Sequence, residues 1–169
     1  MGVTLLTGPV ASGKSSLAVR MGTEHGGPVT VVATAEAGDE EMRVRIARHR
    51  EDRPASWTVV EEPLDLPGAI AGADPDALVI VDCLTLWVTN LLLADRDLAA
   101  ATERAVAAAR DRAAPVVVVT NEVGWGIVPT NDLARAYRET LGRVNRAFAD
   151  VAERVLLVVA GRALPLEAP

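Results

Sequence analysis

The chain has 169 residues, half of them hydrophobic, and a formal net charge of -6. Its length predicts one globular domain over residues 1–169, because two compact domains would each have little core. An acidic chain lacks the excess of basic side chains that general nucleic-acid binding requires, and no stretch approaches the ~20 apolar residues of a membrane span. A single cysteine, Cys83, excludes an internal disulfide framework, so we expect a cytoplasmic protein.

A phosphate-binding loop follows the first predicted strand, Val3 to Leu6. It has two glycines separated by four residues and followed by Lys-Ser, and residues 14–22 after it are predicted to be helical. In this context backbone N–H groups and the helix N-terminus bind phosphates, Lys14 contacts the β- and γ-phosphates, and the Ser15 hydroxyl ligates Mg²⁺. The candidate phosphate-binding residues are Gly8, Pro9, Val10, Ala11, Ser12, Gly13, Lys14 and Ser15.

Apolar, β-branched runs alternate with helical patterns along the rest of the chain. This alternation predicts an α/β fold in which a mostly parallel sheet carries helices on both faces. The further predicted strands are Val29 to Val32, Thr58 to Val60, Leu78 to Val81, Val116 to Val119 and Val155 to Val159, and the further predicted helices are 40–50, 97–112 and 132–152. Pro67 to Pro75 is interpreted as a loop or short helix, and Arg162 to Pro169 as a short tail.

Asp82 ends the predicted strand Leu78 to Val81. A carboxylate at such a strand tip can hold Mg²⁺ beside the loop serine, as in many nucleotide-binding sites. The alternative is that Asp82 caps the helix that follows. Nothing near Cys83 in the sequence identifies a base to activate its thiol, so we interpret it as a small buried residue.

A polar stretch, Asn121 to Gly126, follows the valine-rich strand directly. It is therefore expected at the carboxyl edge of the sheet, where ligands of open α/β folds bind. Asn121 and Glu122 either border the site or serve turn geometry, and the sequence leaves both interpretations open. Trp125 either stacks on a planar or macrocyclic substrate or covers apolar surface.

His49 lies in a segment rich in arginine. These arginines can neutralise a triphosphate and the pyrophosphate that leaves it, which makes His49 a candidate nucleophile toward phosphorus. The alternative is an ordinary solvated helix end, and the residues alone favour this alternative. The other histidine, His25, lies in a glycine-rich loop and is expected to be exposed and inert. The arginines are Arg43, Arg45, Arg48, Arg50 and Arg53.

Several segments together resemble one enzyme family over nearly the whole chain. They are the phosphate loop, Ala33-Thr34, residues 39–54, residues 82–92 and residues 120–129. The arginine-histidine segment and the Asn-Glu-Val-Gly stretch are more specific than the phosphate loop, which many kinases and ATPases share. The family is that of the bifunctional adenosylcobinamide kinases and adenosylcobinamide-phosphate guanylyltransferases of cobalamin biosynthesis.

The resemblance implies a RecA-like phosphate-loop fold, a homotrimer and two successive reactions. ATP or GTP first phosphorylates adenosylcobinamide, and GTP then guanylylates a histidine whose GMP passes to the adenosylcobinamide phosphate. By position that histidine is His49, and Mg²⁺ is the expected metal. The implied nucleotide-site residues beyond the loop are Ala33, Thr34, Ala35, Arg50, Glu51, Asp52, Arg53, Glu61 and Asp82.

The apolar segment Leu84 to Leu93 is a candidate subunit interface for the expected trimer.

The phosphate loop departs from the family pattern at two positions. The loop has Val10 and Ala11 near the positions where the resemblance leads us to expect a second glycine and an arginine, so it supplies no arginine contact to phosphate.

Three other functions remain as alternatives. A kinase of another small metabolite would use the same loop and Asp82 but would not need His49. A regulatory GTPase would require a second lysine to read guanine through an Asn-Lys-x-Asp element, and Lys14 is the only lysine. A RecA-type motor would require a basic surface for nucleic acid.

Overall fold

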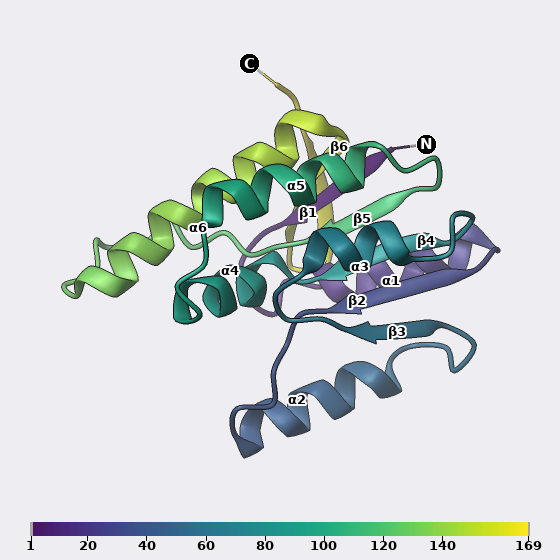
Figure 1. Cartoon of the computed structure of the whole chain (residues 1–169), viewed down its shortest axis with the longest axis horizontal. Coiled ribbons are helices and arrows are strands. Elements are labelled where there is room, and N and C mark those ends of the chain that lie inside the picture. Colours follow the sequence, from purple (N-terminus) through teal and green to yellow (C-terminus); the bar gives the residue numbers. More distant parts are fainter. Residues whose placement is uncertain (1, 169) are drawn as a thin grey trace.

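A seven-stranded sheet forms the centre of the protein (Figure 1). The computed structural model describes residues 2–168, apart from the side chains of Glu41 and Arg45, and orders the strands β3-β2-β4-β5-β1-β6-β7. Neighbouring strands are parallel except β6 and β7, which are antiparallel. The strands are β1 (Val3–Thr7), β2 (Val29–Ala33), β3 (Thr58–Glu61), β4 (Leu78–Asp82), β5 (Val116–Val119), β6 (Ala152–Val159) and β7 (Arg162–Leu166).

Helices cover both faces of this sheet, as predicted. Side chains alternate between the faces along each strand, so Leu78 and Ile80 of β4 pack on the α1 side while Val79 and Val81 pack on the side of α3, α4, α5 and α6. The expected strands and helices are confirmed, each within three residues of its predicted ends. The helices are α1 (Lys14–His25), α2 (Glu40–Glu51), α3 (Leu66–Gly72), α4 (Leu84–Leu93), α5 (Leu98–Arg110) and α6 (Asp132–Val151).

Helix α2 lies outside both helical layers, beside the edge strand β3 (Figure 1). None of its described residues is buried. Its start is fixed by Asp39, whose carboxylate accepts a hydrogen bond of 2.7 Å from the backbone N–H of Met42. Polar contacts rather than a share of the core therefore hold the helix that carries His49.

The C-terminal tail expected at Arg162 to Pro169 is wrong for residues 162–166. They form the edge strand β7, which returns along β6 after a tight turn at Ala160 (φ 50°) and Gly161 (φ 69°). Two successive residues with positive φ give the turn whose twist matches an antiparallel hairpin. Pro165 is tolerated there because an edge strand has one side without a ladder partner.

The expectation that Leu84 to Leu93 forms a subunit interface is also corrected, except at the exposed last residue, Leu93. The segment is helix α4, and Leu84, Trp87, Val88 and Leu91 are at most 2% exposed in the core of their own chain. The indole N–H of Trp87 donates to the carbonyl oxygen of Leu64 at 2.9 Å. Within residues 2–168, no helix combines the length and apolar character needed to cross a bilayer.

Candidate active site

The phosphate loop connects β1 to α1 and packs against β6. Gly8 adopts a φ of +142°, and a Cβ there would lie 2.2 Å from the carbonyl oxygen of Val158. Gly13, which precedes α1, has a φ of +101°. Both glycines are therefore required by backbone conformation, and at Gly8 also by the close approach of β6.

Lys14 is 6% exposed and its ammonium points back across the loop. Its Nζ donates to the carbonyl oxygens of Gly8 at 3.0 Å and Pro9 at 2.6 Å, and to the Ser12 hydroxyl at 3.3 Å. These contacts hold the charge over the concave side of the loop, where phosphate oxygens would replace them.

A cleft of about 800 Å³ opens beside this loop. It runs between α1 and α2 across the sheet and reaches Asp82 at the tip of β4 and Asn121 after β5. Because all these strands are parallel, their carboxyl ends meet at one edge, where ligands of open α/β sheets bind. The sequence-predicted residues that line the cleft are Val10, Ala11, Ser12, Gly13, Lys14, Ser15, Ala33, Ala35, His49, Arg50, Asp52, Arg53, Glu61 and Asp82.

The sequence-predicted residues Gly8, Pro9, Thr34 and Glu51 do not line this cleft. Thr34 is fully buried, and its hydroxyl donates to the carbonyl oxygen of Cys83 at 2.7 Å and accepts from the Cys83 N–H at 2.9 Å. The Thr34 hydroxyl therefore fastens the end of β2 to the end of β4. This contact leaves it on the opposite face from Ala33 and Ala35.

Asp82 joins the histidine to an arginine. Its Oδ2 accepts a hydrogen bond of 2.8 Å from Arg53 and lies 3.5 Å from Nδ1 of His49. Burial raises the pKa of Asp82, but the hydrogen bond from His49 and the positive charge of Arg53 outweigh it and hold that pKa below its ordinary value. Asp82 does not cap α4, because the cap position is Cys83, without a side-chain cap bond.

Residues 4–166 match the family model described as cobinamide kinase / cobinamide phosphate guanyltransferase. The chain belongs to this family. It is 43% identical to the bifunctional adenosylcobalamin biosynthesis protein CobP of Pseudomonas aeruginosa, over 96% of each chain. It is 39% identical to the bifunctional adenosylcobalamin biosynthesis protein CobU of Escherichia coli K12, over 93% of this chain and 95% of that one.

Solved structures with low sequence identity share the fold. The RadB recombinase aligns with a TM-score of 0.50 and 21% identity over 92% of this chain and 73% of its own. A prototypical ATPase from the type III secretion system of pathogenic bacteria aligns with a TM-score of 0.57 and 11% identity, over 92% of this chain and 51% of its own. This cobinamide kinase and guanylyltransferase of adenosylcobalamin biosynthesis therefore has a RecA-like phosphate-loop fold.

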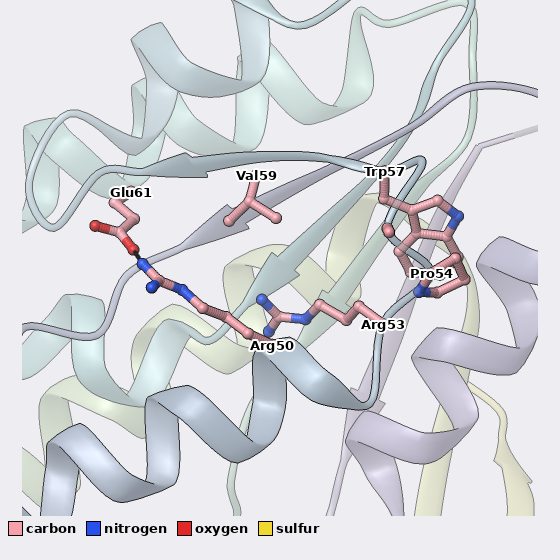
Figure 2. Close-up of a pocket in the computed structure, with 7 residues that line it drawn as sticks. Arg50, Arg53, Pro54, Trp57, Val59 and Glu61 are labelled. Carbon is pink, nitrogen blue, oxygen red and sulfur yellow. Dashed lines mark hydrogen bonds and ion pairs between the residues drawn. The ribbon is translucent and has the colours of Figure 1, made fainter.

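A second hollow of about 530 Å³ adjoins the cleft, between β3 and the end of α2 (Figure 2). Trp57, Val59 and Glu61 alternate with residues of the opposite face, so all three face the hollow. Glu61 forms an ion pair with Arg50 across it. Trp57 was missed by sequence reasoning, although its place two residues before Val59 predicts this shared face.

In the stretch after β5, one residue borders the site and the next forms a turn, so each of the two interpretations left open by the sequence holds for one residue. Asn121 lines the cleft, and its backbone N–H donates to the Thr85 hydroxyl at 3.0 Å. The Glu122 carboxylate instead accepts from the N–H of Gly124 at 3.1 Å, which is turn chemistry. Burial and the charge of Asp82 raise the pKa of the Cys83 thiol, which fits its interpretation as an unreactive residue.

Ser15 and Asp82 bring hydroxyl and carboxylate oxygens to the same cleft. Such oxygens are the ligands that Mg²⁺ prefers, and in nucleotide sites this ion takes its other ligands from phosphates and water. The described side chains form no cluster of three or more His, Cys, Asp or Glu that would make an all-protein metal site. The two residues therefore fit a metal bound together with a nucleotide.

Proposed function

We propose that both reactions of this family take place in the one cleft, with His49 as the guanylylated residue. The chain would phosphorylate adenosylcobinamide with ATP or GTP and then transfer GMP from GTP to the phosphate product. The observation that carries this proposal is that His49 and the phosphate loop line the same cleft. We further propose that the enzyme uses Mg²⁺, acts in the cytoplasm and assembles as a homotrimer.

In the kinase reaction the phosphate loop positions the triphosphate. Backbone N–H groups of the loop and the positive end of α1 bind its oxygens, and the Lys14 ammonium neutralises charge on the transferred group. Mg²⁺, held by Ser15 and Asp82 when bound, supplies further neutralisation of the phosphate charge. The acceptor hydroxyl oxygen then forms a bond to the γ-phosphorus as the bond to the leaving diphosphate breaks, and the hydroxyl proton is released to water.

In the guanylyl transfer His49 attacks the α-phosphorus of GTP. Asp82 faces Nδ1 of the ring at 3.5 Å, so that nitrogen carries the proton and Nε2 presents its lone pair. A bond from Nε2 to phosphorus forms, and the bond to pyrophosphate breaks. An oxygen of the adenosylcobinamide phosphate then attacks the same phosphorus, which breaks the nitrogen-phosphorus bond and gives the GDP derivative.

The arginines of this region supply positive charge for the leaving pyrophosphate. Arg48, Arg50 and Arg53 line the cleft with His49, and the Arg53 side chain is only 9% exposed. Guanidinium groups suit this role because they bind phosphate oxygens through two parallel hydrogen bonds.

Labelling with GTP that carries the label on its α-phosphate tests the nucleophile. We expect denatured parent protein and the His25→Ala variant to retain label, and His49→Ala to retain none while it still phosphorylates adenosylcobinamide. The adduct should survive base and be lost in acid, because protonation of the bridging nitrogen makes it a good leaving group. Acid-labile label on His49→Ala would place the nucleophile elsewhere and overturn the assignment.

A further inference from the structure

Four large exposed apolar side chains lie in the segment that runs from the end of β5 into the first turn of α6. Among residues 2–168, Trp125 is 75% exposed, Ile127 97%, Val128 65% and Leu133 63%. We call these four residues the apolar rim. Trp125 therefore does not cover the protein's own apolar surface, which was one of the two roles expected for it. Exposed apolar groups gathered in one segment mark a surface that binds something.

The backbone that carries the apolar rim is fixed by helix α6. Arg138 donates to the carbonyl oxygen of Gly124, and Arg135 donates to the carbonyl oxygens of Pro129 at 2.9 Å and Thr130 at 2.7 Å. These bonds tie the segment on both sides of Ile127 and Val128. Arginine contacts thus present the rim to solvent in a defined conformation.

The same segment begins inside the active site. Asn121 lines the cleft, and the backbone N–H of Glu122 donates to the carbonyl oxygen of Gly8 in the phosphate loop at 3.1 Å. From there the chain leaves the sheet and runs toward the N-terminal end of α6 (Figure 1). The segment that carries the apolar rim therefore starts at the cleft, and the four rim residues lie beyond the residues that line it.

The size of the acceptor indicates which part of it lies outside the cleft, where the apolar rim can contact it. The cleft measures about 800 Å³, which is within the ~300–1,000 Å³ typical of pockets that enclose one drug-sized ligand. It must hold a nucleotide together with the reacting end of the acceptor. A corrin macrocycle with its adenosyl group is too large to enter as well, so it must lie outside the mouth of the cleft.

We propose that the corrinoid macrocycle of the acceptor docks on the apolar rim, with Trp125 packed against it. This inference rests on the proposed function. The occupant is a large ring system with apolar methyl groups and edges, and a tryptophan offers it a broad apolar face and an N–H donor for its peripheral amides. The aminopropanol arm then extends past Asn121 to the phosphate loop.

Steady-state kinetics with adenosylcobinamide tests this docking. In Trp125→Ala and in Ile127→Ser we expect the KM for adenosylcobinamide in the kinase reaction to rise about tenfold, the effect of one lost buried contact group. The KM for the nucleotide and the labelling of His49 by GTP should stay at parent values, because neither step involves the acceptor. Trp125→Phe keeps an aromatic face and should restore most of the affinity.

The matched control is Leu164→Ala, which removes an exposed apolar side chain on β7. It should leave the KM for adenosylcobinamide unchanged. An unchanged KM in both Trp125→Ala and Ile127→Ser would overturn the proposal. So would a fall in molar mass by light scattering with an unchanged KM, which would make the rim a subunit contact. A parent protein that takes label from GTP but phosphorylates no adenosylcobinamide would instead overturn the proposed function.

Discussion

At position 14 the chain keeps a lysine although its other 16 basic residues are arginines. A compact ammonium fits the concave side of the loop, where it already bonds three oxygen atoms, and a planar guanidinium would not. Asp82 is equally constrained, since one carboxylate meets both Arg53 and His49. Lys14 and Asp82 therefore each contact more than one group, which limits the residues that could replace them.

Replacing Lys14 by Ala should lower both phosphoryl and guanylyl transfer by about 10²–10³, because charge that develops on phosphate would lose its nearest cation. The free energy of unfolding should change by about 1 kcal/mol or less, because the Gly8 carbonyl oxygen keeps its hydrogen bond from the Glu122 N–H and the exposed Pro9 can bind water instead. Enzyme assays and urea denaturation measure the two effects. Arg20→Ala removes an exposed positive charge from the same helix and should change neither. Normal kinase turnover in Lys14→Ala would refute the role of the loop.

Among the helices and strands, hydrophobic patterning predicts those that bury one face in the core. The strands and most helices follow from alternating and helical apolar spacing, because the core buries those faces. Strand β7 does not, since all of its residues are exposed and a turn at Ala160 and Gly161 creates it. The apolar residues of α4 do not say which surface buries them, so the sequence alone does not distinguish a subunit interface from the chain's own core.

The sequence predicts those parts of the site that depend on local backbone conformation, but not the contacts that depend on how distant elements pack. The phosphate loop has a sequence pattern imposed by its glycines, whereas the contact between Asp82 and His49 joins residues 33 positions apart and depends on how α2 docks. The resemblance places Thr34 in the nucleotide site, although the alternation of β2, continued past its end at Ala33, puts Thr34 opposite Ala33 and Ala35. Strand geometry rather than position in a motif decides which side chains face the cleft.

The packing of the phosphate loop against β6 gives a prediction for these elements. Gly8→Ala should lower the free energy of unfolding by about 2–4 kcal/mol, because the added Cβ meets the carbonyl oxygen of Val158 and the φ is unfavourable. Gly26→Ala is the matched control: its φ is +69° and no atom lies within 4 Å of the added Cβ. It should lose only about 1 kcal/mol from backbone conformation. Equal losses in urea denaturation would mean that the contact with β6 is relaxed at little cost.

For the whole molecule, the exposed apolar residues outside the rim bear on assembly. They include Val44 on α2, Leu93 at the end of α4 and Leu166 on β7, and side chains of this kind are commonly buried between subunits. Pro165 in the edge strand β7 disfavours growth by strand pairing, so side-chain surfaces should form the contact. The family resemblance indicates a homotrimer, and a closed ring accounts for a finite assembly.

Light scattering on the purified protein should therefore give a molar mass three times the 17.8 kDa of the chain. Because apolar contacts are not weakened by screening, raising the salt concentration should leave that mass unchanged, whereas an interface built on ion pairs would dissociate. The Leu93→Arg variant puts a charge on an exposed apolar position and should lower the molar mass if this end of α4 is a subunit contact. The Arg96→Leu variant removes a nearby charge and should leave the molar mass unchanged. A fall in molar mass in Leu93→Arg alone therefore indicates a subunit contact rather than a general effect of surface charge. A monomer at micromolar concentration in the parent protein would rule out the trimer, and both active-site proposals would then apply to a single chain.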